Sequence, residues 1–240
     1  MQTYQTTLTK KTVFPNDVDL FHFSLDNPKG IVFTPGQYII LKVPNGASFV
    51  NRLYSIASAS TQTGSFELLI KRVPDGLASN YINTFTVGQK VEFSGPAGQF
   101  SLKNTPHAKV FLTTGTGIAP IRSFILSNKG HAQKYHLFWG MPTMADLYLL
   151  DELKEIAKND PNFKFSVCLS KELSLEKINE AGRRFFSLGH VNEAVLGLIK
   201  NLPQNSLEFY ICGRREVVES LREYLYTHGI DRSLVYFERY

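Results

Sequence analysis

The run Thr114-Gly115-Thr116-Gly117-Ile118-Ala119-Pro120 lies between an apolar, strand-like segment, Val110-Phe111-Leu112, and a stretch with helical spacing. A glycine-rich turn that leaves a strand lets the backbone approach a phosphate or a flat ring closely. The free N–H groups of the following helix favour negative charge. Because Gly-x-Gly turns also occur in ordinary loops, this run indicates a nucleotide site only if other residues agree with it.

The composition is that of an ordinary globular protein. Of the 240 residues, 43% are hydrophobic and 20% are charged, and the chain is long enough for two compact domains. It has no apolar run of membrane-spanning length, and residues 1–6 lack the regions of a signal peptide, so we expect a cytoplasmic protein. The net charge of +5 is compatible with an acidic protein partner, but the basic residues are scattered and predict no nucleic-acid groove.

The two cysteines, Cys168 and Cys212, lie in apolar segments that are typical of buried strands. We therefore expect no structural disulfide in a reducing compartment. Two thiols are also too few for an iron–sulfur cluster that needs four. The sequence predicts no metal site.

The first hundred or so residues alternate with period two, which indicates half-buried strands. The apolar positions fall on one face in two sets: Phe21, Phe23 and Leu25, and Phe66, Leu68 and Ile70. The turn signals are Pro35-Gly36, Pro44-Asn45-Gly46, Pro74-Asp75-Gly76 and Gly95-Pro96. This spacing is typical of a small antiparallel barrel, with a short helix over residues 77–83.

After about Ser101 the pattern changes to short apolar strands that alternate with helices. We expect strands at residues 110–112, 136–139, 165–169, 209–211 and 235–237. Helical spacing relates Leu147, Leu150, Leu153 and Ala157, and it also relates Val218, Leu221 and Leu225. The alternation predicts a parallel, doubly wound sheet, joined to the barrel by residues 103–107. The glycine turn then lies at the carboxyl end of a strand, where such sheets bind ligands.

The segment Arg52-Leu53-Tyr54-Ser55 follows a strand of the first half and combines three chemical functions. The arginine can fork onto a pyrophosphate, the tyrosine can stack on a flat ring, and the serine can hydrogen-bond a ring nitrogen. Taken alone, these four residues are also explained by a purely structural role, in which an exposed arginine lies next to a tyrosine that packs in the core.

Together with residues 114–120 and Tyr210-Ile211-Cys212-Gly213, this segment resembles the ferredoxin–NADP reductase family of flavoproteins. The resemblance extends from about Pro35 to the C-terminus. Further motifs that match the family pattern are Pro35-Gly36-Gln37-Tyr38, Val73-Pro74-Asp75-Gly76 with Ser79, and Gly95-Pro96-Ala97-Gly98.

The resemblance implies a six-stranded FAD-binding barrel in residues 1–102 and an NAD(P)-binding α/β domain in residues 103–240. In the first domain Arg52 is expected to bind the FAD pyrophosphate, Tyr54 to stack on the isoalloxazine and Ser55 to lie near flavin N5. The other FAD-binding residues that it implies are Leu53, Leu69, Ile70, Lys71, Gly76, Leu77, Ala78, Ser79 and Tyr240. An alternative for Ser79 is a simple helix N-cap, and the two roles are compatible.

In the second domain the resemblance places the NAD(P) site at Gly115, Thr116, Gly117, Ile118, Gly140, Met141, Ser170, Lys171, Cys212 and Gly213. Catalytic roles are implied for Ser55, Cys212, Glu238 and Tyr240, with the terminal aromatic ring covering the flavin. A buried cysteine is otherwise usually a packing residue, and a chain end is usually loose.

Residues 170–172, Ser-Lys-Glu, stand where the family usually grips the 2′-phosphate of NADP with a serine and arginines. Lys171 supplies a point charge, whereas Glu172 can repel a phosphate or accept a ribose hydroxyl. Arg183 and Arg184 either assist or lie in a solvated loop, and Pro142 replaces a common arginine. The choice between NADPH and NADH stays open, with a slight preference for NADPH.

The implied function is an FAD-dependent oxidoreductase that takes hydride from NAD(P)H and passes electrons to an external acceptor. The acceptor is expected to be a small acidic ferredoxin or flavodoxin, since the chain lacks a cysteine-rich ferredoxin module of its own. One alternative is a flavin reductase that reduces diffusible flavins. Another is a redox-sensing module without turnover.

Overall fold

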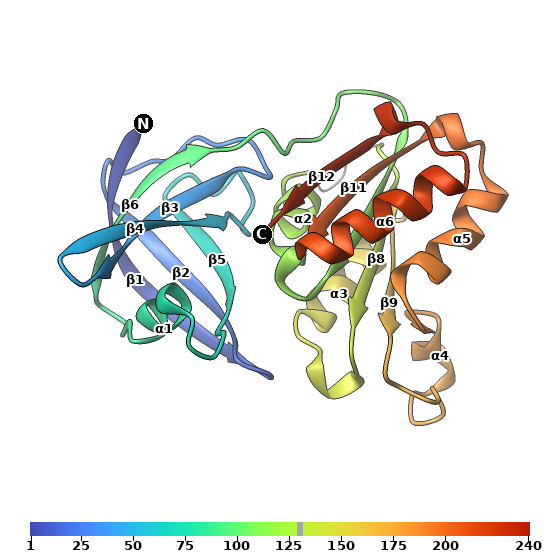
Figure 1. Ribbon diagram of the computed structural model, residues 1–240, viewed down its shortest axis with the longest axis horizontal. Helices are drawn as coiled ribbons and strands as arrows, with labels where there is room; N and C mark the ends of the chain where they lie inside the picture. The colour runs from blue at the N-terminus through green and yellow to red at the C-terminus, as the bar shows by residue number, and fades with distance from the viewer. Residues whose placement is uncertain (129–131) are drawn as a thin grey trace. The chain divides into compact units, whose positions relative to one another are not determined.

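The computed structural model describes residues 1–128 and 132–240 (Figure 1). The contacts of the chain divide it into two compact units. The first contains Met1–Leu102 together with Ala119–Asn128, and the second contains Lys103–Ile118 together with Lys129–Tyr240. Each unit is built on its own six-stranded sheet.

The first unit is an antiparallel barrel. Its sheet has the order β4-β3-β6-β1-β2-β5. The strands are β1 (Gln2–Phe14), β2 (Val18–Asn27), β3 (Tyr38–Asn45), β4 (Ser48–Ser55), β5 (Ser65–Lys71) and β6 (Lys90–Ala97). A bridge between Ile56 and Leu68 joins the chain just beyond β4 to β5, and the Ala57 N–H donates to the Glu67 carbonyl at 2.8 Å. The two outermost strands of the sheet therefore meet, and the predicted antiparallel barrel is confirmed.

The period-two pattern correctly predicts the core of the barrel. Both apolar sets of the sequence are buried, with exposed fractions of 5% or less. Phe23, Phe66 and Phe93 pack their rings with centroids 4.9 to 5.5 Å apart. Helix α1 (Leu77–Asn83) has the bounds expected from the sequence, and it buries Ala78 and Ile82 against the same core.

Helix α2 (Ile118–Ser127) packs on the barrel from Ala119 onward. The Arg122 guanidinium is 7% exposed and donates to the Glu67 carboxylate at 2.6 Å and to the Ala57 carbonyl at 2.7 Å. Ser123 donates to the Ser58 carbonyl at 2.7 Å. A buried ion pair and two side-chain bonds thus fix this helix beside β5.

The prediction of a turn at Gly95-Pro96 is wrong, because both residues lie inside β6. Tyr38 pairs with Ala97 and Ile40 pairs with Ser94, so β6 carries one extra residue opposite β3. Glycine with a φ of +144° and proline without an N–H suit such a bulge, which bends a strand without ending it.

The second unit has a parallel sheet with the order β10-β9-β8-β7-β11-β12. Its strands are β7 (Ala108–Thr114), β8 (Tyr135–Met141), β9 (Phe163–Leu169), β10 (Phe186–Leu188), β11 (Leu207–Gly213) and β12 (Val235–Arg239). The helices are α3 (Leu150–Asn159), α4 (Glu180–Arg183), α5 (Val191–Asn201) and α6 (Arg215–Thr227). The five expected strands are all present, whereas β10, with three residues, is too short to give a periodic signal. The predicted doubly wound parallel sheet is confirmed.

Two helical expectations need revision. Helix α3 begins at Leu150, and Leu147 lies outside it because the intervening Leu149 has a left-handed φ of 58°. Helix α5 was not expected, although Val191, Val195 and Ile199 are buried at a spacing of four residues. These residues join the core that α5 and α6 form on one face of the sheet (Figure 1).

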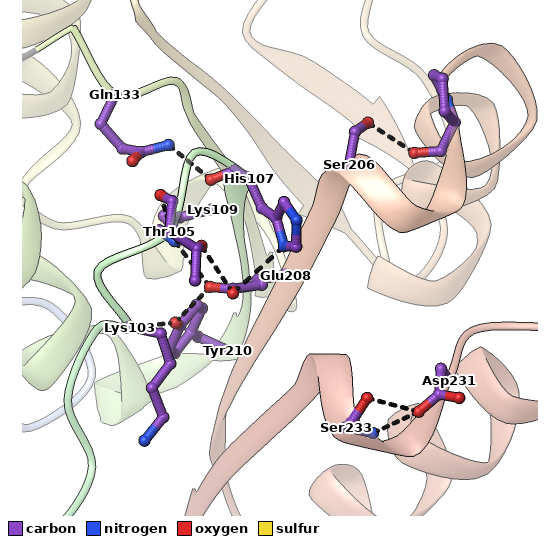
Figure 2. A network of polar contacts seen from close by, with 11 residues as sticks. Lys103, Thr105, His107, Lys109, Gln133, Ser206, Glu208, Tyr210, Asp231 and Ser233 are labelled. Atoms are coloured by element: carbon purple, nitrogen blue, oxygen red, sulfur yellow. Dashed lines mark hydrogen bonds and ion pairs between the residues drawn. The ribbon is translucent and has the colours of Figure 1, made fainter.

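A buried polar cluster at the amino ends of β7 and β11 holds the segment that follows Leu102 (Figure 2). Lys109 and Glu208 are each 1% exposed, and their Nζ and Oε2 atoms lie 2.7 Å apart. Thr105 donates to Oε1 of Glu208 at 2.8 Å, and Tyr210 donates to Oε2 at 2.8 Å. Tyr210 in turn accepts the Lys103 N–H at 2.9 Å, so the predicted join is fastened to the sheet.

None of the helices in the described ranges is long and apolar enough to cross a membrane.

Candidate functional site

The end of β4 presents Arg52 and Tyr54 on one face of the strand, because they are two residues apart. Tyr54 is half-buried against the barrel core, and burial raises the pKa of its hydroxyl to about 12 although the charge of Arg52 opposes this. The Arg52 guanidinium is exposed and donates to the Asn51 carbonyl at 3.0 Å. This face therefore offers a cation and a neutral aromatic ring, which suit a pyrophosphate joined to a flat ring.

Closure of the barrel brings residues 69–71, which are also predicted to bind FAD, beside the end of β4. Because Ile56 bridges Leu68 in antiparallel fashion, Ser55 stands opposite Leu69. Leu69 and Ile70 are each 5% exposed, whereas Lys71 is exposed. Since Ile70 packs in the barrel core and Leu69 is also buried, the backbone of this segment is what remains for a ligand.

The turn before α1 is held by the Ser79 hydroxyl, which accepts the Val73 N–H at 3.0 Å. The helix N-cap is Gly76, without a side-chain cap, so the alternative role of Ser79 as a simple N-cap is wrong. A Cβ on Gly76 would lie 2.7 Å from Ser79 Oγ and 3.0 Å from the Val73 carbonyl oxygen. Glycine is therefore required for the close turn, and the N–H groups of the first helical turn stay uncapped by side chains.

In the second unit, the glycine turn lies at the point where the strand order reverses. The sheet runs from β7 to β8 on one side and from β7 to β11 on the other, and the carboxyl ends of β7 and β11 meet there. The Thr113 hydroxyl donates to the Cys212 carbonyl at 2.8 Å. A Cβ on Gly117 would collide with that same carbonyl oxygen, so only glycine allows the approach. Such a switch point is where open α/β sheets bind their ligands.

Trp139 fixes the other end of this turn, a role that the sequence does not predict. Its indole N–H donates to the Gly115 carbonyl at 3.0 Å, and the indole is fully buried. No spacing or motif in the chain relates these two residues, because Trp139 lies on β8 and Gly115 lies in the turn that follows β7. The turn is thus anchored by Trp139 at one glycine and by close contact with β11 at the other.

The C-terminal residue reaches the same edge. The Tyr240 N–H donates to the Gly213 carbonyl at 3.3 Å, and the Tyr240 and Thr116 hydroxyls lie 3.4 Å apart. The Tyr240 side chain stays 63% exposed. Backbone pairing with Gly213 shows that the chain end is fixed here, which argues against a frayed tail.

Cys212 and Glu238 occupy the same register position on neighbouring strands. The Cys212 thiol is 1% exposed, and burial, assisted by the negative charge of Glu238, raises its pKa well above the ordinary value. Cys212 is therefore a neutral thiol at physiological pH, suited to packing against a ring and unsuited to nucleophilic attack.

The carboxyl ends of β8 and β9 lie along the same edge of the parallel sheet as those of β7 and β11. A Cβ on Gly140 would lie 2.9 Å from methyl groups of both Thr114 and Val191, so glycine is needed where the strands approach the turn. Met141 pairs with Leu169 and is 5% exposed. Both predicted residues thus lie beside the glycine turn.

The segment that follows β9 carries the predicted phosphate-binding residues. The N–H groups of Ser170 and Lys171 donate to the Met141 and Pro142 carbonyls at 3.0 and 2.8 Å, which leaves both side chains exposed. One carboxylate oxygen of Glu172 accepts the Met144 N–H at 2.9 Å. Lys171 is therefore the cation presented at this position, while Glu172 is engaged in holding the neighbouring loop.

The structure also gives the positions of three further residues considered in the sequence analysis. Arg183 donates to the Ile178 carbonyl at 2.9 Å, and Arg184 lies over the Phe185 ring at 4.7 Å, so both arginines hold their own exposed segment. Ile118 is fully buried, and its side chain belongs to the core. A role of Ile118 in nucleotide binding is thus restricted to its backbone.

Two family models match the chain. Residues 5–102 match an oxidoreductase FAD-binding domain, and residues 111–223 match an oxidoreductase NAD-binding domain. Together they cover parts of both units and contain the residues described above except Glu238 and Tyr240, which follow the second match.

Individual relatives agree with these models. The chain is 30% identical over 213 residues to the toluate 1,2-dioxygenase electron transfer component of Pseudomonas putida, covering 88% of this chain and 59% of that protein. It is 29% identical to ferredoxin–NADP reductase B of Sorangium cellulosum, covering 91% and 89%. The chain spans about three-fifths of the length of the first two curated relatives, 59% and 64%.

The fold is also that of a solved structure, a ferredoxin–NADP⁺ reductase from Neisseria gonorrhoeae with bound FAD and NADP. The TM-score is 0.83 with 19% identity, and the match covers 100% of this chain and 99% of that one. The glycine turn, the Arg-x-Tyr-Ser strand end and both domain matches agree, and the chain belongs to the ferredoxin–NADP reductase family of flavoprotein oxidoreductases.

Proposed function

We propose that this protein is an FAD-dependent oxidoreductase that takes hydride from NAD(P)H and passes electrons to a separate acceptor. The observation that carries the proposal is the close approach of Gly117 to the Cys212 carbonyl at the switch point of the parallel sheet. It creates a floor of backbone and a neutral thiol, on which a flat nicotinamide ring can rest. We also propose residues 1–102 and 103–240 as the FAD-binding and NAD(P)-binding domains.

The residues of the barrel fit an FAD molecule. Arg52 would hold the pyrophosphate, Tyr54 would place its ring against the isoalloxazine, and the Ser55 hydroxyl would lie within hydrogen-bond reach of flavin N5. Gly76 allows the close turn before α1, and its N-cap position makes no side-chain cap to the first N–H groups of the helix, which suits a phosphate oxygen there. The backbone of residues 69–71 would line the flavin, and the role of Tyr240 as an aromatic cover stays a prediction.

At the carboxyl edge of the second unit, residues 115–118 would receive the nicotinamide end of the dinucleotide through their backbone. Cys212 and Gly213 would lie under the ring, with Thr116 at its side. Glu238, beside Cys212, would keep the thiol protonated and support the reaction centre. Bound FAD supplies the hydride acceptor and the electron store, while these residues supply position and electrostatics.

The nicotinamide preference that we propose is NADPH. Lys171 is the exposed cation at the expected 2′-phosphate position, and the Glu172 carboxylate is engaged with the Met144 N–H. An ammonium group that faces a phosphate gives a charge-assisted contact that NADH lacks.

The acceptor that we propose is a small acidic ferredoxin or flavodoxin. The net charge of +5 favours an acidic partner through electrostatic steering. Relatives include electron transfer components of dioxygenases and a ferredoxin–NADP reductase, which agrees with a separate electron acceptor. The cytoplasmic location expected from the sequence stays a prediction.

The direct test is a turnover assay with purified protein, NADPH and an oxidised acidic ferredoxin. The proposal requires a yellow protein that retains FAD and reduces the ferredoxin. A colourless protein that reduces added riboflavin as a substrate would instead establish the flavin reductase alternative.

A further inference from the structure

An open cavity of about 490 Å³ lies at the amino ends of β8 and β9 in the second unit, away from the carboxyl edge that carries the nucleotide residues. It is bounded by these two strands and by the last two turns of α5. His136 and Phe138 are two residues apart on β8, so both project from the face on which α5 packs. A cavity of this size is in the range of small-molecule sites.

The polar wall of the cavity is positively charged. Lys134 and Lys164 both line it, and no carboxylate in residues 1–128 or 132–240 forms an ion pair with either. Burial, followed by the charges of Lys164 and Lys134, lowers the pKa of His136 to about 4. The Asp160 carboxylate, on the loop before β9, accepts the Asn162 N–H at 2.9 Å.

The end of α5 does not cancel this charge. A helix C-terminus carries roughly −0.5 of an elementary charge, which is less than the charge of one of the two ammonium groups. The balance at the cavity stays positive, and His136 is a neutral imidazole at pH 7 that can donate or accept a hydrogen bond.

The cavity also has an apolar part. Phe138, Leu198 and Leu202 line it, and Leu202 is 37% exposed. Gly197 precedes Leu198 on α5, and a Cβ placed there would meet no atom within 4 Å. The helix therefore has open space above it at this one position.

We propose that this cavity binds a small organic anion, with an apolar body about the size of one aromatic ring and a carboxylate or phosphate head. The head would lie between Lys134 and Lys164 and accept a hydrogen bond from His136. The body would cover Gly197 and pack against Phe138 and Leu198. Because the nucleotide residues lie at the other end of the same strands, the anion would not occupy the dinucleotide site.

The test uses the flavin-loaded protein with histidine labelled for NMR, and His136→Gln identifies the signal of His136 among those of the six histidines. Phenyl phosphate and benzoate are the probes, and inorganic phosphate and benzyl alcohol represent the head and the body alone. We expect phenyl phosphate or benzoate to shift the His136 signals and to raise the pKa of His136. Each separate fragment should bind at least about tenfold more weakly.

Two variants give the structural controls. Lys164→Gln should weaken binding about tenfold through loss of a charge-assisted contact. Gly197→Leu should abolish binding, since its side chain fills the open space, while the rate of NADPH oxidation stays at the wild-type value. Replacing a helical glycine also favours the helix, so this variant is expected to fold.

The proposal fails if neither organic anion shifts the His136 signals. It also fails if inorganic phosphate binds as tightly as phenyl phosphate, or if Gly197→Leu binds the organic anions as the wild type does. None of these outcomes bears on FAD retention or on reduction by NADPH, which the proposed function requires separately.

Discussion

Cys212 and Glu238 stand at the same register position on adjacent parallel strands, β11 and β12, and β11 pairs with β7 at the point where the strand order of the sheet reverses. The negative charge of Glu238 adds to the effect of burial on the thiol, and together they raise the pKa of Cys212. Cys212, one of the residues for which the family resemblance implies a catalytic role, is thus kept neutral mainly by burial, with a further contribution from Glu238.

This relationship predicts an unreactive thiol. In a Cys168→Ala background, iodoacetamide should alkylate native Cys212 very slowly at all pH values up to 9.0, the ordinary pKa of a thiol. Glu238→Gln should increase the alkylation rate, since it removes a negative charge that opposes thiolate formation. Mass spectrometry of timed samples measures both rates. Rapid alkylation of the unfolded protein is the control, and equally rapid alkylation of the folded protein would contradict the assignment.

The buried pair of Arg122 and Glu67 predicts a large loss of stability. Their Nη1 and Oε2 atoms lie 2.6 Å apart, with side chains 8% and 17% exposed. Arg122→Met leaves the Glu67 carboxylate without this partner, which should lower the free energy of unfolding by about 3 kcal/mol. Urea denaturation measures the change.

Arg215→Met is the matched control, because the ion pair of Arg215 with Glu219 is exposed and should contribute far less to stability. Equal losses in the two variants would show that burial does not determine the contribution of the Arg122 pair.

The environment of Glu208 leads us to expect that its contribution to the free energy of unfolding is lost at acidic pH. Burial alone would raise its pKa, but hydrogen bonds from Lys109, Thr105 and Tyr210 outweigh burial and lower it below the ordinary 4.5 (Figure 2). A group whose folded pKa is lowered stabilises the protein above its unfolded value, and this contribution is lost as pH falls through the folded pKa.

The stability difference between the wild type and Glu208→Gln should therefore be largest above pH 4.5 and should shrink below it. Denaturation curves at a series of pH values give that difference directly. A difference that stays constant, or grows, as the pH falls would mean that the carboxylate form is not the one favoured by folding.

We expect a substitution of Lys171 to weaken the binding of NADPH but not that of NADH. Lys171→Ala should raise KM for NADPH by about tenfold and leave KM for NADH nearly unchanged, because in our proposal the ammonium group contacts the 2′-phosphate, which NADH lacks. Lys177→Ala, an exposed lysine in the same segment, is the control and should change neither value. If Lys171→Ala affects both cofactors equally, the residue does not distinguish them.

The features that could be predicted from the sequence are local. Residues 77–83 form the expected helix, and the alternating apolar residues of β2 and β5 form the expected core. The glycine turn and Cys212 come together because both lie at carboxyl ends of parallel strands, a rule that follows from the strand–helix alternation.

The features that were missed depend on partners far apart in the chain. Arg122 pairs with Glu67, 55 residues away, and Lys109 pairs with Glu208, 99 residues away. Trp139 reaches Gly115 by its indole N–H, and no periodicity encodes such a contact. A strand of three residues, β10, likewise gives no alternation to detect.

The measurement that tests the central claim most directly is an anaerobic titration of the purified protein with NADPH, followed by the visible absorbance of bound flavin. The account predicts that the isolated protein is yellow and that stoichiometric NADPH bleaches the flavin. It also predicts that NADH bleaches it more slowly, and that Cys212→Ala slows bleaching without loss of FAD. Bound flavin that neither NADPH nor NADH reduces would contradict the proposed hydride transfer and would favour a redox-sensing module.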